Sequence, residues 1–78
     1  MDCKTASGPD PDKTCIFPFK FRGITHNCCF LQWDLDVTKA WCSTMVDESG
    51  VHVGGQGKYG FCEEKCQPKV SGKLIIFC

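Results

Sequence analysis

Eight cysteines in a chain of 78 residues restrict the possible folds more than any other feature of this sequence. They form about a tenth of the chain, a proportion typical of small secreted domains held together by disulfide bonds. In a chain of this length, burial alone leaves at best a few kcal/mol of net stability. Four disulfide bonds, at about 2–4 kcal/mol each, could supply the whole stability of such a domain. We therefore expect one secreted, extracellular domain, residues 1–78, that unfolds on reduction.

The spacing of the cysteines argues against a zinc site. Zinc-binding domains use short paired spacings such as two C-x2-C units. Here Cys62 and Cys66 are separated by three residues, Cys28 and Cys29 are adjacent, and the two histidines lie in different segments. We expect neither a metal nor another cofactor.

The charges and the apolar runs exclude two further classes of protein. Nine basic and nine acidic residues cancel, and no basic run is present, so we expect no binding to nucleic acid. Residues 74–77 (LIIF) are far too few to form a transmembrane segment. Because Met1 is followed directly by polar residues, we interpret it as an expression start on a mature fragment whose export signal was removed.

An aromatic segment directly follows Cys15. Phe17, Phe19 and Phe21 recur at every second position, so in an extended chain they share one face. Pro18 confines this segment to a sheet edge or an irregular strand. Other aromatic residues also stand just before cysteines, namely Trp41 before Cys42, and Tyr59 and Phe61 before Cys62. The pattern predicts aromatic rings packed around disulfide bonds.

Turn residues predict two hairpins. Residues 15–21 and 24–30 flank Arg22-Gly23, and residues 41–46 and 51–53 flank a turn that ends in Gly50, which is free to adopt positive φ. Between and around these strands we expect irregular chain. It comprises a proline- and glycine-rich arm at 4–14 held only by Cys3, a loop at 31–40 that contains Trp33, and a flexible joint at 54–57.

Taken together, the cysteines and aromatic residues resemble the pattern of the fibronectin type II module, a kringle-like domain. The matching residues are Cys15, Pro18, Phe19, Phe21, Cys29, Trp41, Cys42, Tyr59, Phe61 and Cys62. The resemblance implies a small all-β fold in which two short, roughly perpendicular antiparallel hairpins surround an aromatic core, with little or no helix. It implies a core at 15–62, an N-terminal arm at 1–14 and a C-terminal tail at 63–78. The extra flanking cysteines resemble the extended variant found in secreted invertebrate proteins.

The resemblance also implies disulfide pairs. The expected bonds are Cys15–Cys42, Cys29–Cys62, Cys3–Cys66 and Cys28–Cys78. The first two follow the family, with Cys29 preferred to Cys28 on spacing alone, and the third follows from the closeness of the termini in kringle-like modules. The fourth would fold residues 67–77 along the second strand of the first hairpin and cover its edge. Alternatively, Cys78 forms an intermolecular bond.

Members of this family bind gelatin or denatured collagen, choline phospholipid headgroups or other extracellular ligands through an exposed aromatic depression. The resemblance implies that Phe21, Trp41 and Tyr59 form this surface. We add Trp33, and His26, which stands where the family usually has an aromatic residue. Such rings attract a quaternary ammonium and also pack against proline and extended peptide.

Core packing is the competing role for the aromatic residues. We favour it for Phe17, Phe19 and Phe61, and it stays open for Trp41 and Tyr59. If the latter two contact ligand, alanine at either position should weaken binding without unfolding the domain. Phe21 lacks the tyrosine hydroxyl usual in phospholipid-binding members, and no second tyrosine follows Trp41-Cys42, so peptide is favoured over choline phosphate.

No motif predicts an enzyme, because neither His26 nor His52 accompanies a nucleophile signature and the cysteines are committed to bonds. The sequence predicts a secreted, monomeric, non-catalytic binding module. Its partner would be an extracellular ligand such as a gelatin- or collagen-like peptide, a lipid headgroup or a glycan. The alternative is a free-standing small toxin or protease inhibitor on the same scaffold, although the glycines of residues 47–57 preorganise an inhibitory loop poorly.

Overall fold

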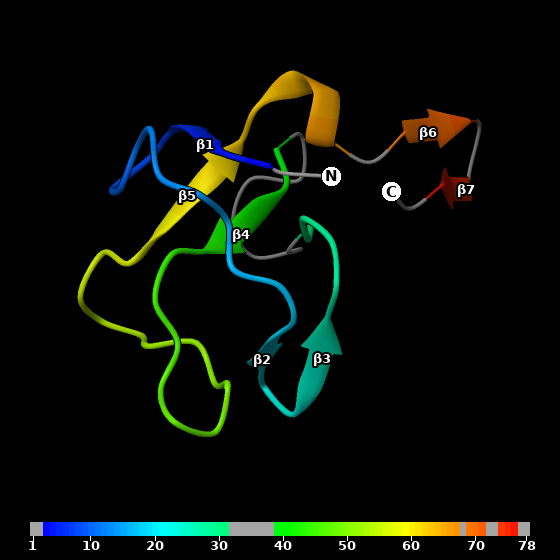
Figure 1. Cartoon of the computed structure of the whole chain (residues 1–78). Coiled ribbons are helices and arrows are strands. Elements are labelled where there is room, and N and C mark those ends of the chain that lie inside the picture. Colours follow the sequence, from blue (N-terminus) through cyan, green and yellow to red (C-terminus); the bar gives the residue numbers. More distant parts are fainter. Residues whose placement is uncertain (1–2, 32–38, 68, 72–73, 77–78) are drawn as a thin grey trace.

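The computed structural model describes residues 3–31, 39–67, 69–71 and 74–76. Short β-strands dominate them, and the helical element in these ranges is one 3-10 turn, η1 (Glu64–Cys66) (Figure 1). The strands are β1 (Thr5–Ser7), β2 (Phe19–Phe21), β3 (Ile24–His26), β4 (Trp41–Ser43), β5 (Tyr59–Cys62), β6 (Lys69–Ser71) and β7 (Leu74–Ile76). The expected all-β fold is confirmed.

The centre of the domain is a three-stranded antiparallel sheet in the order β1-β5-β4. Its middle strand carries Gly60, which lies against β1 so closely that a Cβ there would stand 2.6 Å from the Cβ of Thr5. Thr5 is buried, and its hydroxyl donates a hydrogen bond to the Asp10 carbonyl at 2.6 Å. The expectation that residues 4–14 are held only by Cys3 is therefore wrong, because this arm supplies a strand of the central sheet.

Strands β2 and β3 form the first predicted hairpin, with Phe19 opposite His26. Its turn is made by Arg22 and Gly23, which have φ angles of 52° and 79°. The hairpin therefore forms at the predicted turn, with three residues in each strand.

The second predicted hairpin is present only around its turn, where Val46 bridges His52. The Asp47 carboxylate accepts hydrogen bonds from the backbone N–H groups of residues 49 and 51, which fixes the turn. This turn lies along β2, because the Lys20 N–H donates to the Gly50 carbonyl and the Lys20 carbonyl accepts from the His52 N–H, each at 2.9 Å. Strand β4, which precedes this turn, pairs instead with β5. Residues 54–57 form the turn that reverses the chain ahead of β5.

Three disulfide bonds lie within the described residues: Cys3–Cys66, Cys15–Cys42 and Cys29–Cys62. They are the pairs that the resemblance implied. All six cysteines are buried, and the Sγ atoms of Cys15 and Cys62 are 3.9 Å apart, so the last two bonds pack against each other. The expected bond between Cys28 and Cys78 lies outside the described residues, because Cys78 does.

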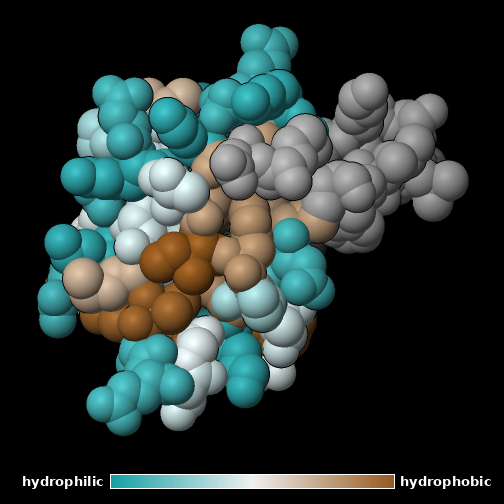
Figure 2. Space-filling model, in the orientation of Figure 1, coloured by the Kyte–Doolittle hydropathy of each residue, from teal (hydrophilic) through white to brown (hydrophobic). Residues whose placement is uncertain are grey.

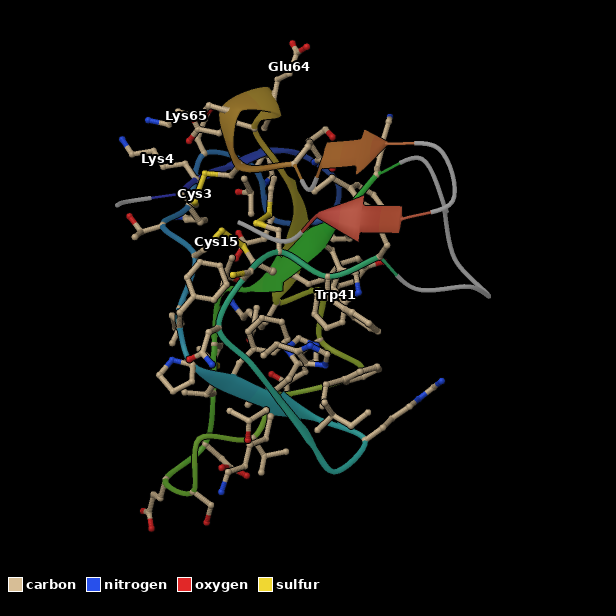
Figure 3. All side chains as sticks on the ribbon, turned by 90° about the vertical axis from the view of Figure 1, so that its right-hand side faces the viewer. Cys3, Lys4, Cys15, Trp41, Glu64 and Lys65 are labelled. Carbon is tan, nitrogen blue, oxygen red and sulfur yellow. A yellow bond between two sulfur atoms is a disulfide. The ribbon has the colours of Figure 1, made fainter. Side chains whose placement is uncertain are left out.

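Phe19 and Trp41 are the large aromatic residues of the core. They are 0% and 2% exposed, and their ring centroids are 5.2 Å apart. Figure 3 shows Trp41 inside the domain, below the disulfide bonds of Cys3 and Cys15. Phe17 and Phe61, for which a core role was also expected, are partly buried and pack against this cluster. Rings and sulfur atoms together replace the aliphatic core that so short a chain cannot build.

The described part of the tail forms a hairpin of its own. Strand β7 pairs antiparallel with β6, with Ser71 opposite Leu74, and among the described strands β3 pairs with β2 alone. Figure 1 shows β6 and β7 beyond η1, to the right of the central sheet. Because β6 and β7 are near in sequence, they satisfy each other's backbone hydrogen bonds without the entropy cost of closing a long loop. That this tail lies along the second strand of the first hairpin and covers its edge stays a prediction, because the expected bond to Cys78 lies outside the described residues.

Candidate ligand-binding site

A pocket of about 220 Å³ opens where β2, β4 and β5 meet the segment that follows the second turn. Its lining residues are Phe21, Trp41, His52, Val53, Gly54, Gly55, Gly57, Lys58 and Tyr59. Three of the five residues predicted to bind ligand, Phe21, Trp41 and Tyr59, thus line one pocket, although they come from three different strands.

Sheet geometry places the rings of β4 and β5 together. Trp41 stands opposite Phe61, and Ser43 stands opposite Tyr59. Residues opposite each other in an antiparallel pair project to the same face, and so do residues two positions apart along one strand. The aromatic residues just before Cys42 and Cys62 therefore share one face, and the Trp41 and Tyr59 centroids are 5.7 Å apart.

Trp41 forms the buried floor of the pocket. Its ring lies edge-on to Phe21 at 5.1 Å and to His52 at 5.1 Å. Its Nε1 is buried and has no hydrogen-bond partner among the described residues, so the side chain stabilises the domain through packing. The expectation of an exposed aromatic patch is corrected here, because Phe21 and Tyr59 are the partly exposed walls while Trp41 is buried.

Of the two other predicted ligand residues, His26 is described and is not part of this pocket. His26 does not line it, and its ring stacks instead on Phe30 at 4.2 Å and lies 5.2 Å from Phe19. Its Nε2 is buried with no hydrogen-bond partner among the described residues, and burial lowers the pKa of His26. Trp33 lies outside the described residues.

His52 belongs to the pocket although the sequence suggested no ligand role for it. Its Nδ1 is 2.7 Å from the Ser43 Oγ, and the Ser43 hydroxyl donates to the Met45 carbonyl at 2.8 Å. A hydroxyl has one proton to donate, so the hydrogen between His52 and Ser43 belongs to Nδ1. Burial lowers the pKa of His52 and favours the neutral ring. The contact between Ser43 and His52 forms because β4 lies beside the segment that follows the second turn, and no local sequence pattern predicts that arrangement.

The close Ser43–His52 contact is not the beginning of a catalytic dyad. Ser43 is 0% exposed, so a substrate carbonyl cannot reach its hydroxyl. Its proton is also directed to a backbone carbonyl rather than to the imidazole. The pair is a structural hydrogen bond that orients the His52 ring.

The electrostatic character of the pocket is mildly cationic. Among its lining residues, Lys58 carries the formal charge and no carboxylate is present. At one wall the Arg22 guanidinium lies 5.1 Å above the Phe21 ring. The pocket therefore favours neutral or anionic groups over an isolated cation.

Metal binding has no support in the described part of the chain. The one cluster of suitable side chains there is Cys15, Cys29 and Cys62. All three form disulfide bonds, so their sulfur atoms are not available as thiolate ligands.

Acidification should destabilise the domain because burial lowers the pKa of both His26 and His52. Below about pH 6.5 the histidines of the unfolded chain bind protons that the folded chain resists. Stability should thus be complete above that pH and fall as pH drops toward the lowered pKa values. Urea unfolding of the oxidised protein between pH 7.5 and 5.5 measures this. A urea concentration at half-unfolding that stays constant or rises on acidification would contradict this loss of stability.

Comparison with known proteins finds seven similar sequences, among them a type IV collagenase and a matrix metalloproteinase. The chain is 34% identical over 68 residues to the 72 kDa type IV collagenase of Gallus gallus, a match that covers 87% of this chain and 9% of that protein. It is 32% identical over 65 residues to matrix metalloproteinase-9 of Canis lupus familiaris, covering 83% of this chain and 8% of that protein. The chain thus spans under a tenth of either relative. No family model and no solved structure matches it.

Proposed function

We propose that this chain is a fibronectin type II-like module that binds a gelatin-like, extended and proline-rich peptide in the aromatic pocket. The convergence of Phe21, Trp41 and Tyr59 on one open pocket carries the proposal. The similarity to a short segment of a type IV collagenase supports it, since that protein is named for its action on collagen.

The pocket has the chemistry that such a peptide needs. Proline rings pack well against the faces and edges of Phe21 and Tyr59, and an extended proline-rich chain is ordered before it binds. On the opposite side the lining residues Gly54 and Gly55 have no side chain, and no atom lies within 4 Å of where a Cβ would stand. This open wall leaves room for a peptide to enter and leave the pocket along its length.

A lipid headgroup fits the same pocket less well. Its quaternary ammonium would approach Lys58 and find no carboxylate among the lining residues. The Phe21 ring offers no hydroxyl to the phosphate, and the Arg22 guanidinium already lies over it at 5.1 Å. Peptide is therefore the ligand that the charges favour.

We further propose that the module acts outside the cell, as a monomer and without catalysis. The disulfide bonds of the described core suit an oxidising compartment. Figure 2 shows apolar residues gathered on one face over the chain that follows β4, with hydrophilic residues to the left of them and below. No helix in the described ranges is long and apolar enough to cross a membrane.

Tyr59→Ala should weaken binding to immobilised gelatin about tenfold or more, because it removes a partly exposed ring from the pocket wall. Tyr59→Phe keeps the ring and should bind nearly as well as the wild type. Ile24→Ala is a matched control, because Ile24 is 59% exposed on β3 and does not line the pocket. Retention on a gelatin surface measures all three variants.

Equal retention of Tyr59→Ala and the wild type would contradict the proposed site. Adding free phosphorylcholine tests the alternative ligand class, since release of the wild type by this compound would point to lipid headgroups. An oxidised, folded protein that gelatin does not retain at all would overturn the proposed function.

A further inference from the structure

We propose that His52 determines which peptides the pocket accepts, through a hydrogen bond that its Nε2 accepts from a backbone N–H or hydroxyl of the bound peptide. The inference rests on the proposed function and names the polar contact of the same pocket. This hydrogen bond from the ligand to His52 would select a peptide segment that presents a hydrogen-bond donor between two apolar groups.

The orientation of the His52 ring is fixed from two sides. Its Nδ1 lies 2.7 Å from the Ser43 Oγ and is the donor of this pair, because the Ser43 hydroxyl donates to the Met45 carbonyl. That edge of the ring is therefore committed to the protein. Trp41, Phe21 and Tyr59 surround the ring with centroids 5.1, 5.9 and 6.4 Å away, all in edge-on arrangements. The imidazole is therefore preorganised, and a ligand loses little entropy in ordering it.

One hydrogen-bonding atom of this ring is left for a ligand. Since Nδ1 carries the hydrogen, the neutral ring has a lone pair on Nε2, and no described residue donates a hydrogen bond to it. The residue lines the pocket between the partly exposed Phe21 and Tyr59. A peptide seated on these two rings would bring a donor within reach of an acceptor that no described residue uses.

Protonation would reverse the role of Nε2 without disturbing the ring. The Nδ1–H bond to Ser43 is the same in the neutral and the charged imidazole, so only Nε2 changes, from acceptor to donor. A bound donor would then face a second donor. Peptide binding should thus weaken as the pH falls through the pKa of His52, which burial lowers below the ordinary histidine value of about 6.5.

The other ionisable side chains described near the His52 ring are lysines, an arginine, a tyrosine and carboxylates. The segments packed against it carry Lys20, Arg22, Lys58 and Tyr59, and the turn on its own segment carries the exposed Asp47 and Glu48. The Asp47 carboxylate is already bonded to two backbone N–H groups of that turn. The one other histidine, His26, lies outside the pocket and serves as an internal comparison.

The test is gelatin binding of the full oxidised chain from pH 7.5 to 4.5, with circular dichroism at each pH to show that the protein is folded. At pH 7.5, His52→Phe keeps a ring but no acceptor and should bind roughly tenfold more weakly, whereas His52→Gln restores an acceptor and should recover most of the loss. The wild type should keep its binding at about pH 6.5 and lose it as the pH falls toward the lowered pKa of His52, while the His52→Phe profile stays flat. His26→Phe should keep the wild-type affinity and pH profile.

Equal affinity of the wild type and His52→Phe would overturn the role of His52, and so would a pH profile that follows His26 instead. If those results accompany loss of binding in Tyr59→Ala, the proposed function survives and only this inference fails. If gelatin does not retain the wild type, both fail. Imidazole 15N NMR of the free protein adds a check without ligand, since a neutral His52 protonated on Nε2 instead of Nδ1 would also overturn the inference.

Discussion

Trp41→Ala should destabilise the oxidised domain by about 3–5 kcal/mol, which is the usual effect of truncating a large buried aromatic residue. Trp41 is 2% exposed, and its ring contacts Phe19 and Phe21 at about the same separation, 5.2 and 5.1 Å. Its backbone also exchanges hydrogen bonds of 2.9 Å with Phe30. The variant would leave a cavity at the point where the hairpin β2–β3 meets the central sheet.

The free energy of unfolding in urea, measured with the disulfide bonds intact, tests this result. A small domain has only several kcal/mol of stability, so Trp41→Ala should be largely unfolded or close to it. Tyr59→Ala is the matched comparison, because this partly exposed ring lies 5.7 Å from Trp41 in the same pocket. A Trp41→Ala variant that keeps the wild-type midpoint and loses only gelatin binding would contradict the buried role.

The second large effect is expected from removing the bond between Cys29 and Cys62, by alanine at both positions. The bond joins residues 33 positions apart, for which chain entropy alone predicts a loss of about 4 kcal/mol. Both cysteines are buried, and Cys62 lies 3.9 Å from Cys15, so the neighbouring disulfide would lose packing as well. Little stability should remain.

Removal of Cys3–Cys66 provides the comparison, because that bond joins residues 63 positions apart and has the larger entropic effect. If packing between disulfides matters, the loss of Cys29–Cys62 should nevertheless lower the melting temperature at least as much. Thermal unfolding followed by far-UV circular dichroism measures both variants. A melting temperature unchanged by loss of Cys29–Cys62 would contradict the stabilising role of the bond.

The sequence predicted those parts of the fold that depend on patterns within one segment. Alternating phenylalanines before Arg22-Gly23 led to the β2–β3 hairpin, and aromatic residues placed just before cysteines led to the rings of the pocket. These features have a local cause, namely a strand period of two and a turn that needs positive φ. The resemblance to the fibronectin type II pattern, and not a local pattern, identified Phe21 and Tyr59, which line the pocket.

The parts of the fold that the sequence did not predict depend on contacts between segments far apart in the chain. Strand β1 has the sequence Thr-Ala-Ser, which shows no strand pattern, and it pairs because Gly60 lets it approach. His52 reaches the pocket only because the second turn lies along β2. The burial of Trp41 likewise follows from rings on both sheets, and a sequence motif does not reveal which face of a tryptophan the solvent reaches.

The close contact of Gly60 with β1 also determines how this domain could be moved into another protein. A fragment of residues 15–62 would contain every aromatic residue of the pocket, yet it would leave β5 with an unpaired edge and Gly60 with a bare backbone in solvent. A graft with an intact sheet must start at Cys3 and extend to Cys66, its disulfide partner. The transferable unit is therefore longer at both ends than the cysteine and aromatic motif of residues 15–62.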